Sequence, residues 1–374
     1  MTAPIAFVAP LPPPVHGFSN ICAAMLNLLR ARAAVNVFDR SPHAAGGLAA
    51  RIRRSANPAR FLIWCIRNKD ARLYLGLSGG WGQIIDGPYV LIARMLGRRI
   101  FVHHHSFAYI NAPSALNRWL FAFLREQTHV VLSRRMGAEL ARIYRLNPSK
   151  LKVVSNAAFY AAIPANSPPR AAGEAPIRLG YLSAVSVEKG IVEFFGVLDE
   201  LRRLGIAHVA KIAGPVDPAA QHRFDELLAG ASNVEYTGPI YGSEKERFYR
   251  DVDVFLFPSD YANEAEPLVV IEAMRSGAYV IACERGAIAE MLANGGGAVC
   301  SRSAYVANAA ACIRRLSADR ADLERAQGLA LMQARRLSEA SSAELSALLE
   351  EISESGHGEP PVPSLQHICG QNQK

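Results

Sequence analysis

Two hydrophobic patterns alternate along most of this chain. Short runs of consecutive apolar residues bounded by Gly, Pro or Ser are typical of strands buried on both faces. Between them, apolar residues recur every three or four positions, as in amphipathic helices. Strands alternating with helices predict parallel sheets covered on both faces, an α/β fold. The expected strands are residues 4–10, 99–105, 129–133, 152–156, 177–183, 208–214, 233–238, 253–259 and 279–283.

Helices are expected between these strands. The first begins near Ser19, where Ile21, Met25 and Leu28 recur at helical spacing, and another is capped near Ser114. A third ends near Leu146. The remaining expected helices are about 190–204, 218–229, 243–250, 267–276 and 318–352.

A proline-rich stretch divides the chain. Residues 161–176 contain four prolines among small and polar residues, which indicates a linker. The expected domains are 1–160 and 177–340, each Rossmann-like and doubly wound, followed by a helix end and a disordered tail in 341–374. Such domains bind ligands at the carboxyl ends of their strands, so we expect these edges to face each other across a cleft.

Charge is distributed unevenly between the two parts. Residues 1–156 contain 21 Lys and Arg against 5 Asp and Glu, a net charge of +16, whereas the remainder has a net charge of −8. This asymmetry indicates an anionic partner for the first domain, either a phosphate-bearing substrate, an anionic membrane surface or nucleic acid. No helix-turn-helix, RNP or zinc pattern is present, so nucleic acid is not expected. A basic face without any partner stays as the alternative.

Location is indicated by what the sequence lacks. The six cysteines are scattered without a CxxC pair, which favours reduced thiols in a cytoplasmic protein. The N-terminus has no basic region before its apolar stretch, so no signal peptide is expected. No apolar run reaches the roughly 18 residues that a membrane-spanning helix needs. We expect a cytoplasmic protein, free or peripheral on the inner face of the plasma membrane, where Trp119 and Phe121 are candidates to enter the interface.

The segment 263–282 carries the most informative chemistry. Glu264 lies in the loop after an expected strand, and Glu272 lies within the following helix. A loop carboxylate can accept hydrogen bonds from sugar hydroxyls, and one in the first turns of a helix can reach a ribose diol. Pro267 suits a first helical turn, and the helix N-terminus can face a diphosphate. Two glutamates on a helix surface are the structural alternative.

This segment resembles the signature of the family 4 glycosyltransferases, which are retaining enzymes of the GT-B fold. That signature has a Glu, seven residues, a second Glu, an Ala and, shortly after, a Gly, here Gly277. The resemblance implies that Glu264 contacts the donor sugar and Glu272 the nucleotide ribose. It also places backbone N–H groups of Pro267, Leu268 and Val269 near the donor phosphates.

A second match lies in residues 182–190. The family commonly has an arginine and then a Lys-Gly pair, and Lys189 and Gly190 fit the pair. The resemblance implies that Lys189 neutralises the leaving diphosphate. The family's arginine falls at Ala184 and is missing. Because a metal-free enzyme stabilises a departing diphosphate with cations and oriented dipoles, this departure keeps a catalytically inactive scaffold open as an alternative.

Further candidates follow from the same resemblance. The loop 10–20 occupies the place of a glycine-rich turn against the donor phosphates, with Gly17 and its neighbour His16. Gly214 matches a strand-end position. A simple loop is the alternative for 10–20.

Three consecutive histidines end the strand 99–105. Adjacent strand residues point to opposite faces, so His103 and His105 share one side and His104 the other. No neighbouring carboxylate or cysteine completes a ligand set, and we expect no metal site. The resemblance places a donor-facing histidine here, best matched by His105 and then His103, with a core histidine as the alternative.

These features together predict a metal-independent, retaining glycosyltransferase that uses no cofactor besides its donor. The expected donor is a UDP-, GDP- or ADP-sugar, and the expected acceptor is a glycan or lipid-linked, phosphate-bearing molecule in bacterial surface polysaccharide or glycolipid synthesis. Another GT-B nucleotide-sugar enzyme, such as an epimerase, and a non-catalytic anion- or nucleic-acid-binding scaffold are the alternatives.

Overall fold

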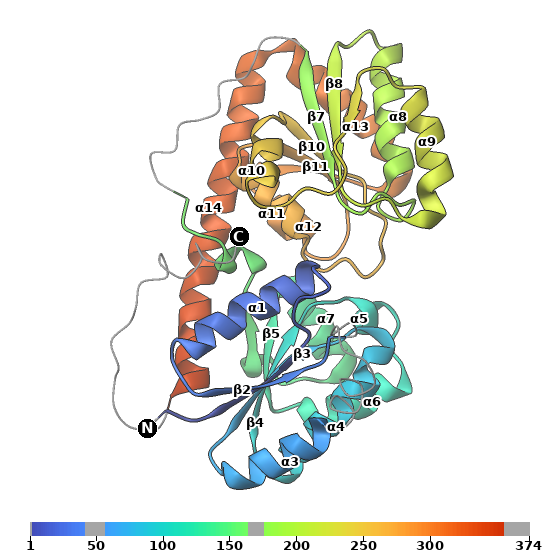
Figure 1. Cartoon of the computed structure of the whole chain (residues 1–374). Coiled ribbons are helices and arrows are strands. Elements are labelled where there is room, and N and C mark those ends of the chain that lie inside the picture. Colours follow the sequence, from blue (N-terminus) through green and yellow to red (C-terminus); the bar gives the residue numbers. More distant parts are fainter. Residues whose placement is uncertain (1, 42–56, 164–175, 355–374) are drawn as a thin grey trace. The chain divides into compact units, whose positions relative to one another are not determined.

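The computed structural model describes residues 2–41, 57–163 and 176–354, which form two α/β units (Figure 1). The first unit contains the described residues up to 161 together with 338–354, and the second contains those from 162 to 337. Most of the predicted linker and the predicted disordered tail lie outside the described residues. No helix in the described ranges is long and apolar enough to cross a membrane.

The first unit is built on a six-stranded parallel sheet in the order β2-β1-β3-β4-β5-β6. Every residue of β1 is buried, as expected for a strand covered on both faces. Ile5 of β1 pairs with Val35 on one side and Arg72 on the other. The strands are β1 (Ile5–Ala9), β2 (Val35–Asp39), β3 (Arg72–Leu77), β4 (Arg99–His104), β5 (Thr128–Val131) and β6 (Leu151–Val153).

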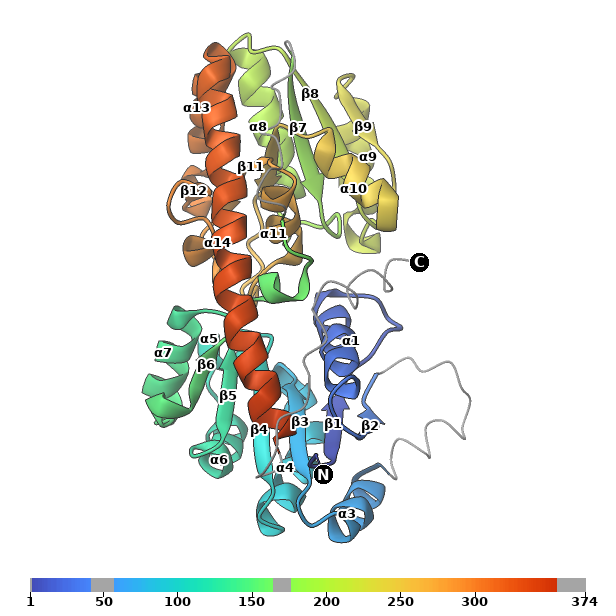
Figure 2. The same ribbon diagram turned by 90° about the vertical axis from the view of Figure 1, so that its left-hand side faces the viewer.

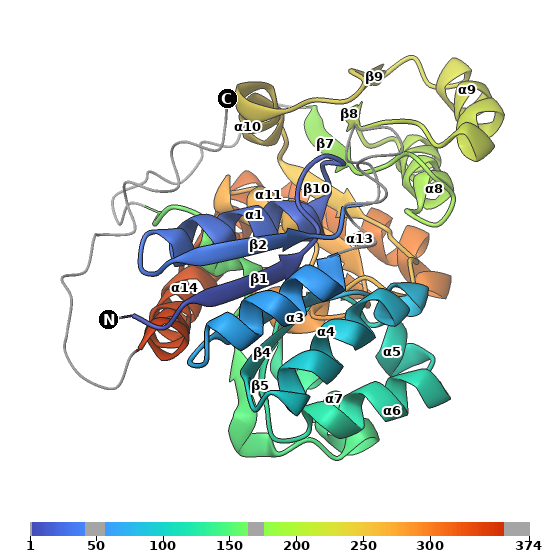
Figure 3. The same ribbon diagram turned by 60° about the horizontal axis from the view of Figure 1, so that its bottom comes forward.

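Helices cover both faces of this sheet. One face carries α1 and the end of α14, and the other carries α3, α4 and α6 (Figures 2 and 3). Helix α6 begins after Ser114, whose hydroxyl accepts the Asn117 N–H in the predicted cap. The helices are α1 (Gly17–Arg30), α3 (Asn57–Arg67), α4 (Gln83–Met95), α5 (Ala108–Asn111), α6 (Ala115–Leu124) and α7 (Arg134–Tyr144).

The second unit repeats this plan with a parallel sheet in the order β12-β11-β10-β7-β8-β9. Its core includes Tyr181 and Phe194, whose rings meet edge to face. The strands are β7 (Ile177–Leu182), β8 (His208–Ala213), β9 (Val234–Tyr236), β10 (Val254–Phe257), β11 (Tyr279–Cys283) and β12 (Gly297–Cys300). The helices are α8 (Ile191–Arg203), α9 (Gln221–Ala229), α10 (Gly242–Arg250), α11 (Leu268–Arg275), α12 (Ile288–Met291) and α13 (Tyr305–Ala318).

The 34-residue helix α14 (Arg320–Ser353) contributes to both units. In the second, Gln327 donates a hydrogen bond to the Asp253 carbonyl. In the first, Ser338 donates to the Ala157 carbonyl, and Glu351 pairs with Arg99. Residues 338–354 therefore fold with the N-terminal part of the chain.

All nine strands expected from the sequence are present, with ends that differ by a few residues. The sequence interpretation missed β2, β3 and β12, as well as α3, α4, α13 and the short helices α5 and α12. Phe121 was wrongly offered as an interfacial side chain: it is fully buried and stacks on Tyr144, with ring centroids 4.1 Å apart. Trp119 on the same helix is 47% exposed.

Candidate active site

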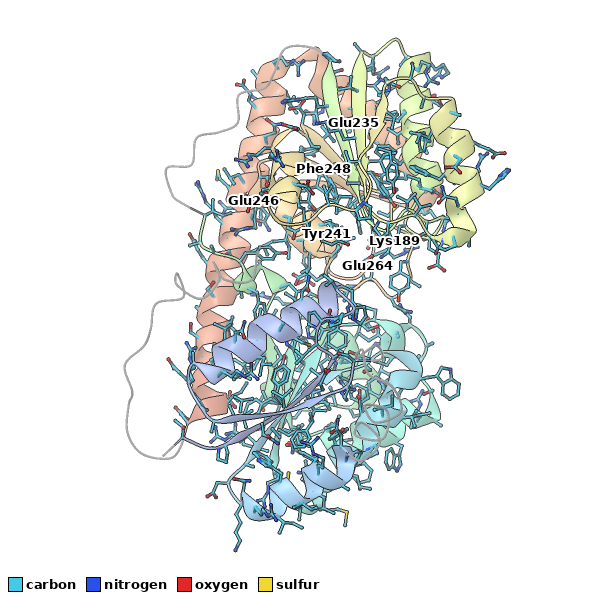
Figure 4. All side chains as sticks on the ribbon, in the orientation of Figure 1. Lys189, Glu235, Tyr241, Glu246, Phe248 and Glu264 are labelled. Carbon is cyan, nitrogen blue, oxygen red and sulfur yellow. The ribbon has the colours of Figure 1, made fainter. Side chains whose placement is uncertain are left out.

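Two loops at the carboxyl edge of the second sheet bring Lys189 and Glu264 together. Lys189 follows β7, Glu264 follows β10, and Lys189 Nζ lies 2.6 Å from Glu264 Oε2 (Figure 4). Ser259 donates a hydrogen bond to the same oxygen over 3.2 Å. The ammonium also lies 4.5 Å from the ring centroid of Tyr261, a cation–π distance. The pair is partly buried, so each charge compensates the other where water has limited access.

Glycines let the backbones of these loops approach closely. Gly190 has φ +80°, and a Cβ built there would lie 2.3 Å from the Pro258 carbonyl oxygen. Gly286 has φ +48°, and its Cβ would lie 2.3 Å from the Glu264 carbonyl oxygen. The Asp260 N–H donates to the Glu188 carbonyl over 2.8 Å. The positions of Lys189 and Glu264 are thus fixed by main-chain packing.

Glu272 forms a second polar group one turn into α11. Lys245 Nζ lies 2.6 Å from its Oε2, and the Tyr249 hydroxyl donates to the same oxygen over 3.0 Å. The two partners come from α10 at i and i+4, a spacing that places them on one face of a helix. The sequence interpretation missed Lys245 and Tyr249, because this spacing does not reveal what the face contacts.

The start of α11 supplies backbone donors. Leu268 and Val269 are its first two residues, where N–H groups have no intrahelical acceptor. Pro267 is the N-cap and has no N–H, so the expectation that it contributes a donor is corrected to these two residues. The positive end of the helix dipole adds to the attraction for an anion.

Gly214 stands where β8 ends beside β7. Its φ is +129°, and a Cβ would lie 1.8 Å from the Ser183 carbonyl oxygen, so the position requires glycine. The neighbouring Ala184 is exposed and brings no charge to the edge where the resemblance calls for an arginine.

The candidates of the first unit gather around Phe18. Its ring centroid lies 4.5 Å from that of His105 and 6.3 Å from that of His16. His16 is the N-cap of α1, where its Nδ1 accepts the Ser19 N–H over 3.1 Å, and Gly17 is the first helical residue. His16 therefore has a structural role in the helix start.

His105 is the half-buried member of the histidine run. Its ring centroid lies 4.0 Å from that of His103, which confirms that the two share one side of β4. Its Nε2 is buried without a hydrogen-bond partner among the described residues. Burial holds the pKa of His105 well below its usual value, so the imidazole is neutral. A neutral ring with an unused nitrogen suits a hydrogen bond to a ligand hydroxyl.

The other two histidines serve the core. The Nδ1 of His103 lies 2.6 Å from the Tyr74 hydroxyl, and burial lowers its pKa to about 3. His104 lies on the opposite face, hydrogen-bonded to Tyr109 and to His129. No group of three or more His, Cys, Asp or Glu in the described residues has an arrangement that could hold a metal ion.

The DVD sequence at 251–253 also has a structural explanation. Asp253 lies between α10 and β10, and its two carboxylate oxygens accept hydrogen bonds from Nε and Nη2 of Arg178 over 2.9 and 2.7 Å. This bidentate pair joins β7 to the start of β10, at the junction between α10 and β10.

Comparison with known proteins decides the family resemblance. Residues 176–319 match the family model Glycosyl transferases group 1. The resemblance to the family 4 glycosyltransferases is confirmed. The matched glycosyltransferase segment contains Lys189, Gly214, Glu264 and Glu272 together.

A curated relative agrees with this match. The chain is 31% identical over 112 residues to the sulfoquinovosyl transferase SQD2 of Arabidopsis thaliana. The alignment covers 30% of this chain and only 20% of the relative's length.

Solved glycosyltransferase structures share the fold over almost the whole chain. HepE of Anabaena, crystallised with UDP and glucose, is 16% identical with a TM-score of 0.68, covering 93% of this chain and 100% of its own. The sucrose-phosphate synthase of Thermosynechococcus elongatus is 17% identical with a TM-score of 0.69, covering 93% and 98%. At such identities the likeness shows the fold alone, and that fold is GT-B, as predicted.

Proposed function

We propose that this chain is a glycosyltransferase that moves a sugar from a nucleotide-diphosphate sugar to an acceptor hydroxyl. The observation that carries the proposal is the arrangement in the second unit: the Lys189–Glu264 pair, the start of α11 and Glu272, all in one segment with a glycosyltransferase match. A cation, backbone donors and two carboxylates are what a diphosphate, a sugar and a ribose require.

Each part has a role in the proposed donor site. The N–H groups of Leu268 and Val269 and the α11 dipole bind the diphosphate, and Lys189 neutralises charge as it departs. Glu264 accepts hydrogen bonds from the donor sugar, and Glu272 accepts them from the ribose diol. Gly214 keeps the β8 end close to the β7 end. Structural neighbours have been crystallised with UDP or UDP-glucose, so UDP is the first nucleotide to test, before GDP and ADP.

The proposed reaction retains the anomeric configuration and needs no metal. The acceptor oxygen bonds to the anomeric carbon on the face that the diphosphate leaves, while the bond from that carbon to the phosphate oxygen breaks. The acceptor proton passes to the departing diphosphate. His105, with its unused Nε2, is proposed to hydrogen-bond the reacting sugar. His103 is the second candidate for this role, and the His16–Gly17 loop is proposed as a further contact to the donor.

The acceptor is proposed to be a glycan or a lipid-linked, phosphate-bearing molecule, in bacterial surface polysaccharide or glycolipid synthesis. The support is the net charge of +16 in residues 1–156, which attracts anionic molecules. A cytoplasmic location with peripheral attachment to the inner membrane face fits the same charge.

Calorimetric titration with UDP, GDP and ADP in EDTA tests the donor site. We expect one nucleotide to bind, and Glu272→Gln to weaken it about 10-fold or more, since a charged hydrogen bond is worth about 1.5–3 kcal/mol. Glu246→Gln is the matched control, because Glu246 is an exposed residue on α10.

Two results would count against the proposal. If none of the three nucleotides bound, with or without EDTA, the chain would instead be a non-catalytic scaffold. Equal affinity in Glu272→Gln and the wild type would remove the ribose assignment. Once the base is known, the anomeric configuration of the product distinguishes retention from inversion, and a free isomerised nucleotide sugar would indicate an epimerase.

A further inference from the structure

Exposed apolar side chains gather on one side of the first unit. On α3, Leu62, Ile63 and Ile66 are 38%, 50% and 55% exposed. They lie on the helix side opposite Phe61 and Cys65, which are buried against the sheet. Three large aliphatic side chains on the outer side of one helix exceed the scattered exposure of ordinary surfaces.

Helix α4 continues this surface with an apolar stripe. Ile84, Pro88, Leu91 and Met95 are spaced i, i+4, i+7 and i+11, so they follow one line along the helix. Met95 is 77% exposed at the end of the stripe. At the other end, Trp81 in the preceding turn η1 (Gly80–Gly82) is 81% exposed.

The helices α3, α4 and α6 lie side by side, with α4 in the middle (Figure 3). Trp119 of α6 reaches α4, because a Cβ added to Gly87 would lie 3.8 Å from its ring. The surface formed by the outer sides of α3, η1, α4 and α6 is called the docking face below.

Positive charge surrounds the docking face. Residues 57–125 contain nine Lys and Arg and only two acidic residues, Asp70 and Asp86. Asp86 is fully buried and paired with Arg40, so it adds no negative charge to the surface. The exposed arginines of the three helices are Arg60, Arg67, Arg94 and Arg118, and the exposed Arg125 directly follows α6.

We propose that the docking face binds an anionic lipid bilayer, with the α4 stripe and Trp81 entering the interface and the arginines contacting lipid phosphates. Exposed aliphatic and Trp side chains flanked by arginines form the pattern of interfacial membrane binding. A second copy of the chain fits less well, because a symmetric contact would place arginines against arginines. This inference builds on the proposed lipid-linked acceptor, but membrane binding is measured without any sugar transfer.

Vesicle co-sedimentation of the full chain tests the proposal. Vesicles of phosphatidylcholine with about 30% phosphatidylglycerol are expected to bind roughly 10-fold more protein than phosphatidylcholine alone, with binding reduced by salt. The double variant Ile84→Ser/Met95→Ser is expected to lower binding to the anionic vesicles by about 10-fold. The matched control is Val209→Ser/Met332→Ser, two exposed apolar positions of the second unit, 39% and 43% exposed.

Tryptophan fluorescence locates the contact. Brominated lipid in the same anionic vesicles is expected to quench the wild type. Trp81→Phe is expected to remove the larger share of that quenching, and Trp119, which is 47% exposed on the same face, accounts for the remainder. Trp64→Phe is the control, because the Trp64 ring is only partly exposed and packs edge-on against Phe38 of β2, with ring centroids 6.2 Å apart. Unchanged quenching in Trp81→Phe would overturn the assignment of this turn to the interface.

Three further outcomes overturn the proposal. The first is that the wild type does not bind anionic vesicles, and the second is that both double variants bind them equally. The third is a wild-type dimer in sedimentation velocity that is dissociated by Ile84→Ser/Met95→Ser. That result would identify a second copy of the chain as the occupant of the docking face. Calorimetry of Ile84→Ser/Met95→Ser with UDP separates the two hypotheses. Vesicle binding without nucleotide binding refutes the donor site alone, and nucleotide binding without vesicle binding refutes the docking face alone.

Discussion

Gly190 joins the packing of the second unit to the position of Lys189, and Gly190→Ala tests that link. The residue is the N-cap of α8 with φ +80°, and a Cβ there would lie 2.3 Å from the Pro258 oxygen and 2.7 Å from its carbonyl carbon. Gly205→Ala is the matched control, since Gly205 follows the same helix with φ +69° and open space around it.

The two variants separate backbone strain from close contact. Alanine in the left-handed region costs about 1–2 kcal/mol, and this is the whole cost expected at Gly205. At Gly190 the new methyl group must also displace main-chain atoms of the loop after β10, which adds about 1–3 kcal/mol. Because the displaced loop carries Glu264, and Lys189 is the adjacent residue, nucleotide affinity should fall in Gly190→Ala and stay unchanged in Gly205→Ala.

Differential scanning calorimetry and nucleotide titration measure the two effects. With roughly 2–4 °C of Tm for each kcal/mol, Gly190→Ala should melt several degrees below Gly205→Ala. Equal melting temperatures would refute the idea that close contact with Pro258 fixes this loop. A lower melting temperature with wild-type affinity would show that the contact stabilises the unit without positioning Lys189.

Two further predictions concern single side chains. Tyr261→Leu should weaken nucleotide binding a few-fold in calorimetry, because a cation–π contact to Lys189 is worth about 0.5–1 kcal/mol at a partly exposed site. Tyr261→Phe should bind the nucleotide with the affinity of the wild type. Equal affinity in all three proteins would show that the ring does not position the ammonium. Burial lowers the pKa of His129 to about 4 from its usual 6.5, so below pH 6.5 the unfolded chain takes up a proton that the folded chain excludes. At about 1.4 kcal/mol per pKa unit, the free energy of unfolding of the wild type should therefore fall by about 3 kcal/mol more than that of His129→Asn between pH 6.5 and pH 4. Urea unfolding measures both pH profiles, and parallel profiles for the two proteins would contradict this.

The hydrogen bonds of the buried histidines explain why protonation should destabilise the folded chain. His129 Nε2 lies 3.0 Å from the Leu124 carbonyl oxygen and must donate its proton to it. Its Nδ1 then accepts from His104 Nε2, and His104 Nδ1 accepts from the Tyr109 hydroxyl. Both rings are neutral in this chain of hydrogen bonds, and a second proton on either would face another donor in a buried site.

Strong apolar runs made much of the fold predictable. Strands such as β1 and β10 are buried throughout, and their sequences contain little else than apolar residues. The missed β2 and β12 are edge strands with mixed burial, so their sequences do not carry a continuous apolar run. In β3 the run is present but interrupted by Gly76, which packs against Ala9 and Phe18.

The candidate site was predictable only where a linear motif reports it. Glu264, Glu272 and Lys189 belong to motifs with fixed spacing, so each could be named as a candidate from its own neighbours. Their partners depend on contacts between distant segments: Lys189 and Glu264 are 75 residues apart, and Lys245 is 27 residues from Glu272. Periodicity on α10 places Lys245 and Tyr249 on one face, but the tertiary fold alone determines that this face meets α11.

The missing arginine at Ala184 gives the Lys189–Glu264 pair added importance in the proposed reaction. Without donor, the lysine charge is compensated by Glu264, so the half-buried site carries no isolated charge. A diphosphate at the start of α11 offers Lys189 a more strongly charged partner, and the transfer of the ammonium to it leaves Glu264 Oε2 able to accept a sugar hydroxyl. Ser259 retains its contact with that oxygen and holds the carboxylate in place. The movement of Lys189 from Glu264 to the diphosphate would thus prepare both the leaving-group site and the sugar site. A single lysine can serve the proposed metal-free reaction because its charge is compensated until the donor arrives.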